Sequence, residues 1–323
     1  MPSSKFDPDT LPDLTGKIFL VTGGNAGIGK ATVAGLAGRG ATVYMGARSP
    51  DKALSSIADI RREFPAADIR FVHIDHANLE SVVVAAGQML QTESKLHGLV
   101  NNAGVMGIPY LVTQDHFEIQ FQTNYVSHWL LTQRLLPLLM ATARVEGPGA
   151  VRIVNVTSDG HSRYPPKEGI RFNDINLEKE SSMARYGQSK LANILHVQQL
   201  NKRYGPGDAD GPGVPGEIWT AAVHPGHIDT GLNKQATAMA PPTILRILTP
   251  LMRCAGILDE QAKGALSSLF AVASPEFTRS NSGAYVVPYA KIGTPSAAAE
   301  DAALAGKLWD WTTEALQSKG LLL

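Results

Sequence analysis

The stretch from Ile18 to Lys30, IFLVTGGNAGIGK, decides the fold. Its first four residues are all apolar, which is typical of a strand that is buried on both faces. A glycine-rich turn follows, and after it apolar residues recur at the spacing of a helix. The order of strand, tight turn and helix predicts that Gly23, Gly27 and Gly29 let the backbone approach a pyrophosphate at the start of the helix.

The glycine spacing in this turn is Gly-x-x-x-Gly-x-Gly rather than the commoner Gly-x-Gly-x-x-Gly of dinucleotide-binding turns. A glycine cluster is weak evidence on its own, because a turn that needs positive φ angles uses the same residues and binds nothing. The choice between a phosphate-binding turn and a purely structural one therefore depends on the rest of the chain.

Length, charge and cysteine content restrict the kind of protein. The chain has 323 residues, with 29 Lys and Arg against 29 Asp and Glu and no basic block, so its charge does not call for nucleic acid. The single cysteine, Cys254, excludes an intramolecular disulfide and fits a reducing compartment. No stretch supplies the roughly 20 apolar residues of a transmembrane helix, and the N-terminus has no signal-peptide core. We expect a cytoplasmic protein without a transmembrane segment, whose partners are small molecules.

Apolar runs and helical periodicities alternate along the chain. Strands are expected at residues 18–21, 41–46, 69–74, 97–100, 150–156, 217–223 and 283–287. Helices are expected at 50–63, 114–143, 243–258, 260–274 and 297–317, and a further helix opens at Tyr186. This alternation predicts an α/β fold with a Rossmann-type, doubly wound parallel sheet of about seven strands. We expect a surface arm at 1–15 and a single domain over 16–323, with ligands at the carboxyl ends of the strands.

The end of the second strand selects the nucleotide. An acidic residue there would accept hydrogen bonds from a ribose 2′-hydroxyl, whereas Ala47 carries no charge and Arg48 offers a guanidinium to a 2′-phosphate. NADP(H) is therefore favoured over NAD(H), with Lys52 as a second candidate for the phosphate. The alternative is that Arg48 is an ordinary solvated arginine at the start of the next helix.

Polar residues follow or interrupt several of the expected elements. Asp75 follows the third strand and could cap the next helix or reach an adenine. The fourth strand leads into Asn101-Asn-Ala-Gly104, which can form a polar turn beside a cofactor or an ordinary turn. Asn124 lies among apolar residues of the long helical pattern. A buried asparagine must be hydrogen-bonded, although its amide could serve only to bridge helix backbone.

Tyr186 and Lys190 stand at positions i and i+4 of one helix. This spacing puts the phenol and the ammonium on one helix face, about 5–6 Å apart at Cβ. A phenol with a pKa near 10 is a poor acid, and a neighbouring ammonium favours the phenolate and lowers that pKa. The fifth strand delivers Ser158 to the same edge of the sheet. An isolated tyrosine–lysine pair, however, is more often a helix-surface feature.

Taken together, in their order and spacing, these residues resemble the short-chain dehydrogenase/reductase family. The resemblance spans roughly residues 16–290 and rests on Thr22-Gly-Gly-Asn-Ala-Gly-Ile-Gly29, Asp75, Asn101-Asn-Ala-Gly104, Asn124, Ser158, Tyr186-x-x-x-Lys190 and Pro225-Gly226 with Thr230. The long segment between Ser158 and Tyr186 and the extended C-terminal part look like the retinol-dehydrogenase-type and fungal secondary-metabolite reductases. The chain departs from the membrane-bound retinol enzymes in lacking an N-terminal anchor.

The resemblance implies a role for each catalytic residue. Tyr186 would donate or accept the proton of the carbonyl or alcohol, and Ser158 would hold the same oxygen. Lys190 would lower the tyrosine pKa and bind the nicotinamide ribose, and Asn124 would hold a water that connects Lys190 to solvent. The implied cofactor contacts are Gly23, Asn25, Ala26, Gly27, Ile28, Gly29, Arg48, Lys52, Asp75, His76, Asn102, Ala103, Gly104, Tyr186, Lys190, Pro225, Gly226, Ile228 and Thr230.

Residues 243–258, TILRILTPLMRCAGIL, carry apolar side chains on a broad helical face. They fall where the family has its substrate lid, which we expect at about 231–258, near the C-terminus of the domain. An apolar lid predicts a bulky hydrophobic substrate. The rival interpretation is a helix that lies on a membrane surface, since Arg246 and Arg253 could meet lipid phosphates.

These features predict an NADP(H)-dependent oxidoreductase that reduces an aldehyde or ketone to an alcohol, or the reverse, on a bulky hydrophobic small molecule. The alternative is an NADP(H)-binding sensor or scaffold without turnover. We expect no metal, because His161, His224 and His227 have no metal-ligand spacing, and we interpret them as structural or substrate-lining. The family often dimerises through the helices that carry Asn124 and Tyr186, so a homodimer is possible unless the long additions block that surface.

Overall fold

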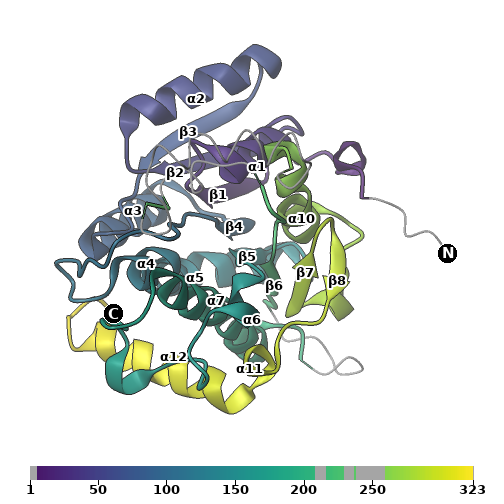
Figure 1. The fold of residues 1–323 in the computed structure, drawn as a ribbon. Helices are drawn as coiled ribbons and strands as arrows, with labels where there is room; N and C mark the ends of the chain where they lie inside the picture. Colours follow the sequence, from purple (N-terminus) through teal and green to yellow (C-terminus); the bar gives the residue numbers. More distant parts are fainter. Residues whose placement is uncertain (1–5, 208–215, 229–235, 238–258, 323) are drawn as a thin grey trace.

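The computed structural model describes residues 6–207, 216–228, 236–237 and 259–322, which form an eight-stranded sheet flanked by helices (Figure 1). Across the sheet the strands are β3 (Asp68–His73), β2 (Thr42–Ala47), β1 (Ile18–Thr22), β4 (Gly98–Asn101), β5 (Arg152–Val156), β6 (Trp219–Val223), β7 (Ala284–Val287) and β8 (Lys291–Gly293). Neighbouring strands are parallel except β7 and β8, which are antiparallel. The predicted Rossmann-type sheet is confirmed, and the unpredicted β8 has only three residues.

Helices cover both faces of this sheet, as expected for a doubly wound fold (Figure 1). One face carries α1 (Gly27–Ala37), α2 (Pro50–Glu63) and α10 (Gln261–Ala273), and the other carries α3 (Leu79–Thr92), α5 (Ser127–Glu146) and α7 (Ser182–Tyr204). Each layer encloses its own apolar core. The shorter elements and the last helix are η1 (Pro8–Thr10), α4 (Ile119–Phe121), the π-turn η2 (Gln122–Val126), α6 (Gly160–Arg163), η3 (Phe172–Asp174), η4 (Arg279–Asn281), α11 (Ala297–Glu300) and α12 (Ala302–Gln317).

The strand order reverses between β1 and β4. The chain leaves β1 through α1 to β2 on one side, whereas β4 pairs with the other side of β1. The helices that follow these two strands, α1 and α5, therefore lie on opposite faces of the sheet, and ligands of open α/β sheets bind at such a switch point. Strands β4 and β5 are buried over their whole length, and the polar Asn101, Arg152 and Asn155 in them are hydrogen-bonded.

The N-terminal arm is attached to the domain more firmly than the sequence suggested. Phe6, Leu11 and Leu14 are buried, and the Phe6 ring contacts the ring of Phe270 in α10 with 5.6 Å between centroids. The Arg39 guanidinium also donates a hydrogen bond from Nε to the Leu11 carbonyl at 2.9 Å. In the described residues 6–15 the expected surface arm is therefore anchored to the domain, because three spaced apolar side chains are buried in an otherwise polar, exposed segment.

Two of the expected helices are interrupted. The pattern at 114–143 becomes helical only after Glu118, whose carboxylate caps the first amides of α4, and the π-turn η2 separates α4 from α5. The expected terminal helix at 297–317 is divided into α11 and α12 by Asp301, whose carboxylate accepts hydrogen bonds from two amides in the first turn of α12. In both cases a capping carboxylate fixes a helix start that periodicity alone does not reveal.

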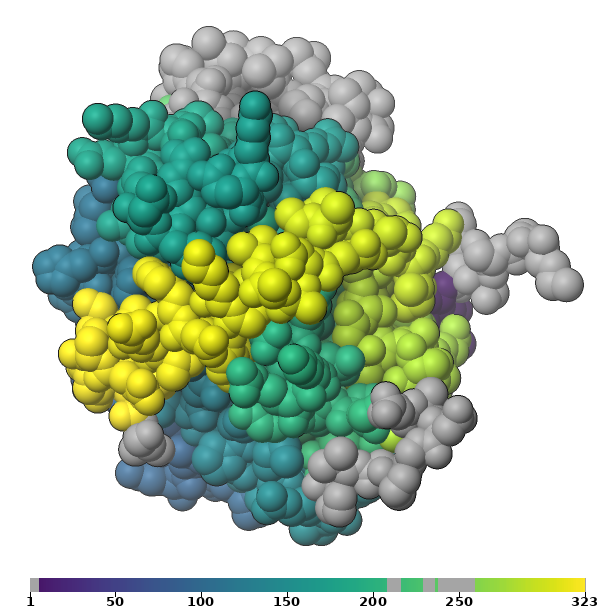
Figure 2. Space-filling view, turned by 90° about the horizontal axis from the view of Figure 1, so that it is seen from below, coloured from purple at the N-terminus to yellow at the C-terminus, as the bar shows by residue number. Residues whose placement is uncertain are grey.

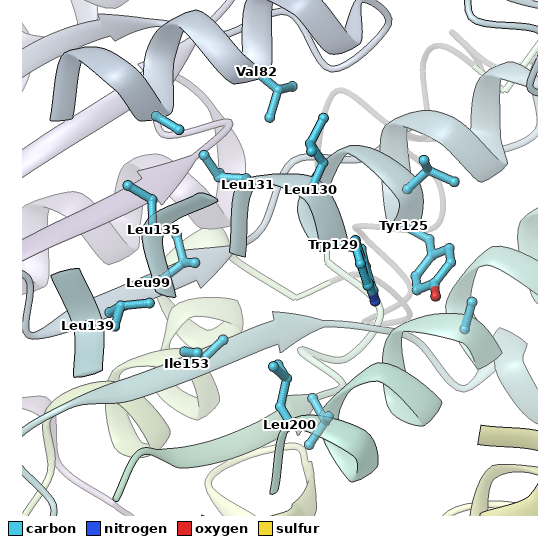
Figure 3. Packing of buried hydrophobic residues seen from close by; sticks show 14 of the residues in the cluster. Val82, Leu99, Tyr125, Trp129, Leu130, Leu131, Leu135, Leu139, Ile153 and Leu200 are labelled. Carbon is cyan, nitrogen blue, oxygen red and sulfur yellow. The ribbon is translucent and has the colours of Figure 1, made fainter. Parts of the chain in front are cut away.

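Helix α12 lies across α7 and α5, and Figure 2 shows this last segment of the chain, in yellow, across the teal elements. Trp309 of α12 packs against Trp129 of α5 with ring centroids 5.2 Å apart. Trp129 and the neighbouring Tyr125 belong to the core shown in Figure 3. A homodimer through α5 and α7 would therefore require α12 to move away from the surface that it covers.

The C-terminal third includes the expected lid at about 231–258, which lies outside the described residues apart from Ala236 and Thr237. In the described ranges, no helix is both long and apolar enough to cross a membrane. The described part of the site is formed by the sheet and the helices around it.

The hydrogen bond between Tyr125 and Thr312 should stabilise the attachment of α12. The two hydroxyls are 2.7 Å apart, and because Thr312 donates its proton to the Leu308 carbonyl, Tyr125 is the donor. Thr312→Val should lower the free energy of unfolding by about 1–3 kcal/mol, since the buried phenol loses its acceptor. Adding Tyr125→Phe should restore most of that loss in urea unfolding. A double variant no more stable than Thr312→Val would contradict this assignment.

Candidate active site

The turn between β1 and α1 brings backbone rather than side chains to the edge of the sheet. Gly23 and Gly27 have φ angles of 64° and 57°, which glycine adopts without steric penalty. At Gly29 an added Cβ would lie 2.3 Å from the Gly23 carbonyl oxygen and 2.5 Å from Asn102 Nδ2, so no side chain fits. Helix α1 starts at Ala26 without a side-chain cap, which leaves its first amides available to an anion.

Thr22, the last residue of β1, connects this turn to the loop after β4. Its Oγ1 accepts hydrogen bonds from the amides of Asn102 at 2.9 Å and Ala103 at 3.0 Å. In return, Asn102 Nδ2 donates to the Thr22 carbonyl at 2.8 Å. These bonds hold the two loops side by side at the switch point of the sheet.

Asn124 lies in the π-turn η2, a kind of helix irregularity that is frequent at functional sites. Its Oδ1 accepts from the Val105 amide at 2.8 Å, and its Nδ2 donates to the Val105 carbonyl at 3.0 Å and to Ser189 Oγ at 2.9 Å. The amide therefore bridges the loop after β4 to α7 rather than its own helix backbone. An added Cβ on Gly104 would lie 3.2 Å from Asn124 Oδ1 and 3.5 Å from Lys190 Nζ, so these three residues meet.

Ser158, Tyr186 and Lys190 converge at the carboxyl end of β5. The Ser158 hydroxyl interacts with the Tyr186 phenol, and Lys190 Nζ lies 5.7 Å from the centre of the phenol ring. Lys190 also donates to the Val156 carbonyl at 3.0 Å. The tyrosine and the lysine are only 6% and 4% exposed. An added Cβ on Gly160 would lie 3.1 Å from the phenol ring, so a residue without a side chain makes room for Tyr186.

Burial dominates the ionisation of this group. Burial raises the pKa of the Tyr186 phenol to about 12, against the opposing hydrogen bond with Ser158. Burial also lowers the pKa of the Lys190 ammonium to about 8. The expectation that Lys190 lowers the tyrosine pKa is thus not met in this structure, because desolvation of the phenolate outweighs attraction by an ammonium at this distance. Near neutral pH the phenol keeps its proton.

The residues expected to select the nucleotide lie where β2 ends and α2 begins. Arg48 and Lys52 are exposed, and within the described residues neither side chain has a hydrogen bond or ion pair. Asn25, Ala26 and Lys52 line a surface pocket of about 400 Å³ between the starts of α1 and α2. Two cations are therefore free to meet an anion beside the glycine turn.

Asp75 does not cap the next helix, and the His76 side chain is turned to α5. Asp75 Oδ1 accepts from the Ala77 amide at 3.0 Å, and Asn78, not Asp75, caps α3. The buried His76 ring lies with Nδ1 2.8 Å from Ser127 Oγ in α5. If His76 contacts a cofactor, it would therefore do so through its backbone. The contact of Asp75 with an adenine stays a prediction.

The loop after β6 borders the other side of the glycine turn. An added Cβ on Gly264 would lie 2.7 Å from Ile228 Cγ1 and 2.9 Å from Ile28 Cγ1, so the two isoleucines meet over the start of α10. Of the expected cofactor contacts in this loop, Pro225, Gly226 and Ile228 follow β6, whereas Thr230 lies outside the described residues.

Sequence reasoning missed His128. Its Nδ1 is 3.0 Å from the Asn124 carbonyl, which can only accept, so Nδ1 carries the proton. The other ring nitrogen, Nε2, then accepts from the Thr22 hydroxyl at 2.8 Å. Burial lowers the pKa of His128 to about 4, so the ring is neutral near pH 7. A signal existed, since His128 follows Asn124 by one helical turn and faces the same way.

Asp159 was also missed. Its Oδ1 accepts a hydrogen bond from Ser158 Oγ at 3.2 Å, which places a carboxylate next to this hydroxyl. The signal in the sequence was its position directly after Ser158.

The histidines near the site are not arranged as metal ligands. His161 donates from Nδ1 to the Ser158 carbonyl at 2.7 Å and accepts at Nε2 from the Ser296 amide at 3.1 Å, so both ring nitrogens have partners within the protein. His224 is buried and His227 is exposed on the loop after β6. Over the described part of the chain, no group of three or more His, Cys, Asp or Glu side chains could hold a metal ion.

A glycine turn at the switch point, together with a half-buried serine and a buried tyrosine and lysine, defines a nucleotide-dependent oxidoreductase of the Rossmann type, and comparisons agree. A family model described as short chain dehydrogenase matches residues 17–169. The chain is 54% identical over 317 residues to the short-chain dehydrogenase/reductase drtF of Aspergillus calidoustus, covering 98% of each. It is 40% identical over 304 residues to an uncharacterized oxidoreductase of Schizosaccharomyces pombe, covering 92% of this chain and 84% of that protein.

A solved structure resembles the whole chain. The crystal structure of an uncharacterized protein from Mycobacterium paratuberculosis matches with a TM-score of 0.70 and 27% sequence identity, over 97% of this chain and 98% of that one. The chain therefore belongs to the short-chain dehydrogenase/reductase family, whose members are oxidoreductases that bind a nicotinamide cofactor.

Nucleotide binding should depend on the bare backbone at Gly29. Gly29→Ala should weaken NADPH binding by at least about tenfold, because the methyl group would displace the Gly23 carbonyl or Asn102 and so misplace the turn. Gly87→Ala is the matched control: an added Cβ in the middle of α3 meets no atom within 4 Å. Fluorescence titration with NADPH measures both variants, and equal affinities would show that the turn is structural only.

Proposed function

We propose that the protein is an NADP(H)-dependent oxidoreductase that interconverts a carbonyl group and an alcohol on a bulky, mainly hydrophobic small molecule. The observation that carries this proposal is the buried Tyr186 phenol, which lies with Ser158 and Lys190 at the same edge of the sheet as the glycine turn. A nucleotide sensor would need the turn and a phosphate-binding cation but no proton donor.

The residues at this edge fit a nicotinamide dinucleotide. The turn at Gly29 leaves space that a Cβ would fill, and the free amides at the start of α1 suit a pyrophosphate. Lys190 and the loop after β6 would hold the nicotinamide end, and Asn124 would connect Lys190 to solvent through a water. When bound, the cofactor supplies or accepts the hydride.

The protein's own task is to bind the reacting oxygen and to move a proton. A carbonyl that gains hydride develops negative charge on oxygen, and the hydroxyls of Ser158 and Tyr186 would both donate hydrogen bonds to that atom. Tyr186 then transfers its proton to the oxygen, because an alkoxide is a much stronger base than a phenolate. The raised pKa of Tyr186 keeps the proton in place until that moment.

The positive charge of Lys190 would stabilise the phenolate that remains. Its Nζ lies 5.7 Å from the centre of the phenol ring, in a site where burial strengthens the interaction of charges. The bond from Lys190 to the Val156 carbonyl fixes the ammonium on this side of the helix.

NADP(H) is the nucleotide favoured by the charges around the end of β2. Arg48 and Lys52 are exposed and unpaired within the described residues, and the position before Arg48 is the buried, uncharged Ala47. Lys30, which also lines the nearby pocket, is already paired with Asp59 at 2.7 Å. Arg48 and Lys52 are therefore the cations that remain for a 2′-phosphate.

The substrate class and location rest on the sequence. The apolar segment at 243–258 supports a lid over a hydrophobic substrate, and the single cysteine of the chain supports a cytoplasmic location. The homodimer stays the least supported part of the proposal, because α12 covers the surface that subunits would share.

Tyr186→Phe should reduce kcat by about 10²–10⁴-fold, since it removes the proton donor and keeps the ring. NADPH affinity should stay within a few-fold of the wild type, because the phenol acts on the substrate oxygen. Turnover is followed by NADPH absorbance with a panel of aromatic and aliphatic carbonyl compounds. Tyr204→Phe, at the end of the same helix, is the matched control. Tight NADPH binding by the wild type without consumption across the panel would support the sensor instead.

Arg48→Ala should raise the KM for NADPH at least about tenfold and leave the KM for NADH nearly unchanged, because only NADPH carries the phosphate that the guanidinium would bind. Only Arg48 is changed, because an acidic residue at the buried position 47 would also disturb the packing around it. Arg62→Ala, on an exposed turn of α2, serves as control. An unchanged preference would mean that the phosphate is bound elsewhere, with Lys52 the next candidate.

A further inference from the structure

The proton of the Ser158 hydroxyl is directed at a carboxylate. Ser158 Oγ donates to Asp159 Oδ1 at 3.2 Å, and the same oxygen accepts from the Gly160 amide at 3.1 Å. A serine hydroxyl has one proton, so Ser158 cannot donate to Asp159 and to a substrate oxygen at the same time. A substrate that uses Ser158 must therefore leave the Asp159 carboxylate with one hydrogen bond fewer.

Within the described residues, Asp159 does not use its carboxylate to cap a helix. It precedes α6 at the capping position, yet its side chain makes no capping hydrogen bond. Its Oδ2 pairs with Arg163 at 2.9 Å, and the arginine is 61% exposed. The Asp159 side chain itself is 24% exposed, so it is reachable from solvent beside the catalytic tyrosine.

The carboxylate lies between the two loops that border the site. His227 Nε2, on the loop after β6, is 3.7 Å from Asp159 Oδ2, while Ser158 holds the other carboxylate oxygen on the loop after β5. The negative charge also acts on the Tyr186 phenol, whose pKa it helps to raise. Asp159 is therefore close enough to touch whatever the serine and the tyrosine bind.

We infer that Asp159 is a specificity-determining residue that accepts a hydrogen bond from a hydroxyl of the substrate. A substrate hydroxyl on one of the two carbons next to the carbonyl would replace Ser158 as the donor to Oδ1, and Ser158 would then turn its proton to the carbonyl oxygen. This inference rests on the proposed function and refines its substrate class to hydroxy-carbonyl compounds.

A carbonyl compound without such a donor binds at a disadvantage. It must take the proton of Ser158 from the carboxylate and offers nothing in exchange, which leaves a partly buried acceptor short of a partner. Sites built to bind a substrate hydroxyl discriminate strongly against analogues that lack it. Because Arg163 still pairs with Asp159 and water can reach it, we expect a moderate preference of at least about tenfold in kcat/KM.

Three ketones of nearly equal size test this preference. α-Hydroxyacetophenone carries the donor, propiophenone replaces the hydroxyl by a methyl group, and α-methoxyacetophenone keeps the electron-withdrawing oxygen without a proton to donate. The wild-type enzyme with NADPH should have a kcat/KM at least about tenfold higher for the hydroxy compound than for either of the others. A preference shared by the methoxy compound would reflect carbonyl reactivity and would overturn the inference.

The Asp159 variants give changes of opposite sign for the two kinds of substrate. Asp159→Ala should lower kcat/KM for α-hydroxyacetophenone, and it should maintain or raise it for propiophenone, because Ser158 is no longer held by the carboxylate. The kcat/KM values of Asp159→Asn should lie between those of the wild type and those of Asp159→Ala, since an amide oxygen is a weaker acceptor than a carboxylate. Glu168→Gln, a carboxylate paired with Arg171 on the same segment, is the matched control and should keep the wild-type preference.

The outcomes separate this inference from the proposed function. Reduction of all three ketones at similar rates by the wild type would overturn the inference and leave the proposed function standing. NADPH binding without reduction of any ketone in the wider carbonyl panel would overturn both. If Asp159→Ala does not fold, as judged by thermal unfolding, the wild-type preference for the hydroxy over the methoxy compound decides alone.

Discussion

The hydroxyl of Thr22 is the interaction on which the rest of the site depends. It accepts hydrogen bonds from the amides of Asn102 and Ala103 and donates to His128, so one buried oxygen joins β1, the loop after β4 and α5. The neutral His128 ring passes this constraint to the Asn124 carbonyl in the π-turn. The position of the glycine turn is therefore fixed relative to the π-turn that carries Asn124.

Polar groups in the core require such complete pairing, because a buried donor or acceptor without a partner costs about 1–3 kcal/mol. Asn124 donates both protons of its amide to Val105 and Ser189 and accepts from the Val105 amide, and Lys190 directs its ammonium at the Val156 carbonyl. Each bond joins elements that come from different parts of the chain. The hydrogen bonds that pair these buried polar groups thus also hold the side chains of Asn124 and Lys190 in one arrangement before a substrate binds.

Much of this architecture could be predicted from the sequence. Buried parallel strands give apolar runs, and Gly29 is needed because its backbone lies close to the Gly23 carbonyl. The Tyr186 and Lys190 pair could be predicted as well, since helical spacing alone puts the two side chains on one face. Periodicity could not show where Glu118 and Asp301 start new helices, because a cap depends on one side chain and not on a pattern.

The pKa values of Tyr186 and Lys190 depend mainly on how deeply the two side chains are buried, and burial cannot be read from the sequence. Helical spacing correctly placed an ammonium near the Tyr186 phenol, but how far the tyrosine is buried follows from packing by α6 and the β5 loop. For the same reason Asp159 and His128 were not predicted. Their importance comes from hydrogen bonds to Ser158, Asn124 and Thr22. The partners Ser158 and Asn124 are close in sequence, but only the folded chain shows that these bonds form and that His128 also reaches Thr22.

The central claim is that this edge of the sheet transfers hydride from a nicotinamide to a carbonyl carbon while the protein supplies the proton. Reduction of a ketone by NADPH deuterated at the transferred position of C4 tests it directly, with mass spectrometry and NMR of the alcohol. The account predicts a single deuterium on the carbinol carbon and a proton from water on the oxygen, with product formation lost in Tyr186→Phe. Alcohol that forms without deuterium on carbon, or undiminished product formation by Tyr186→Phe, would contradict it.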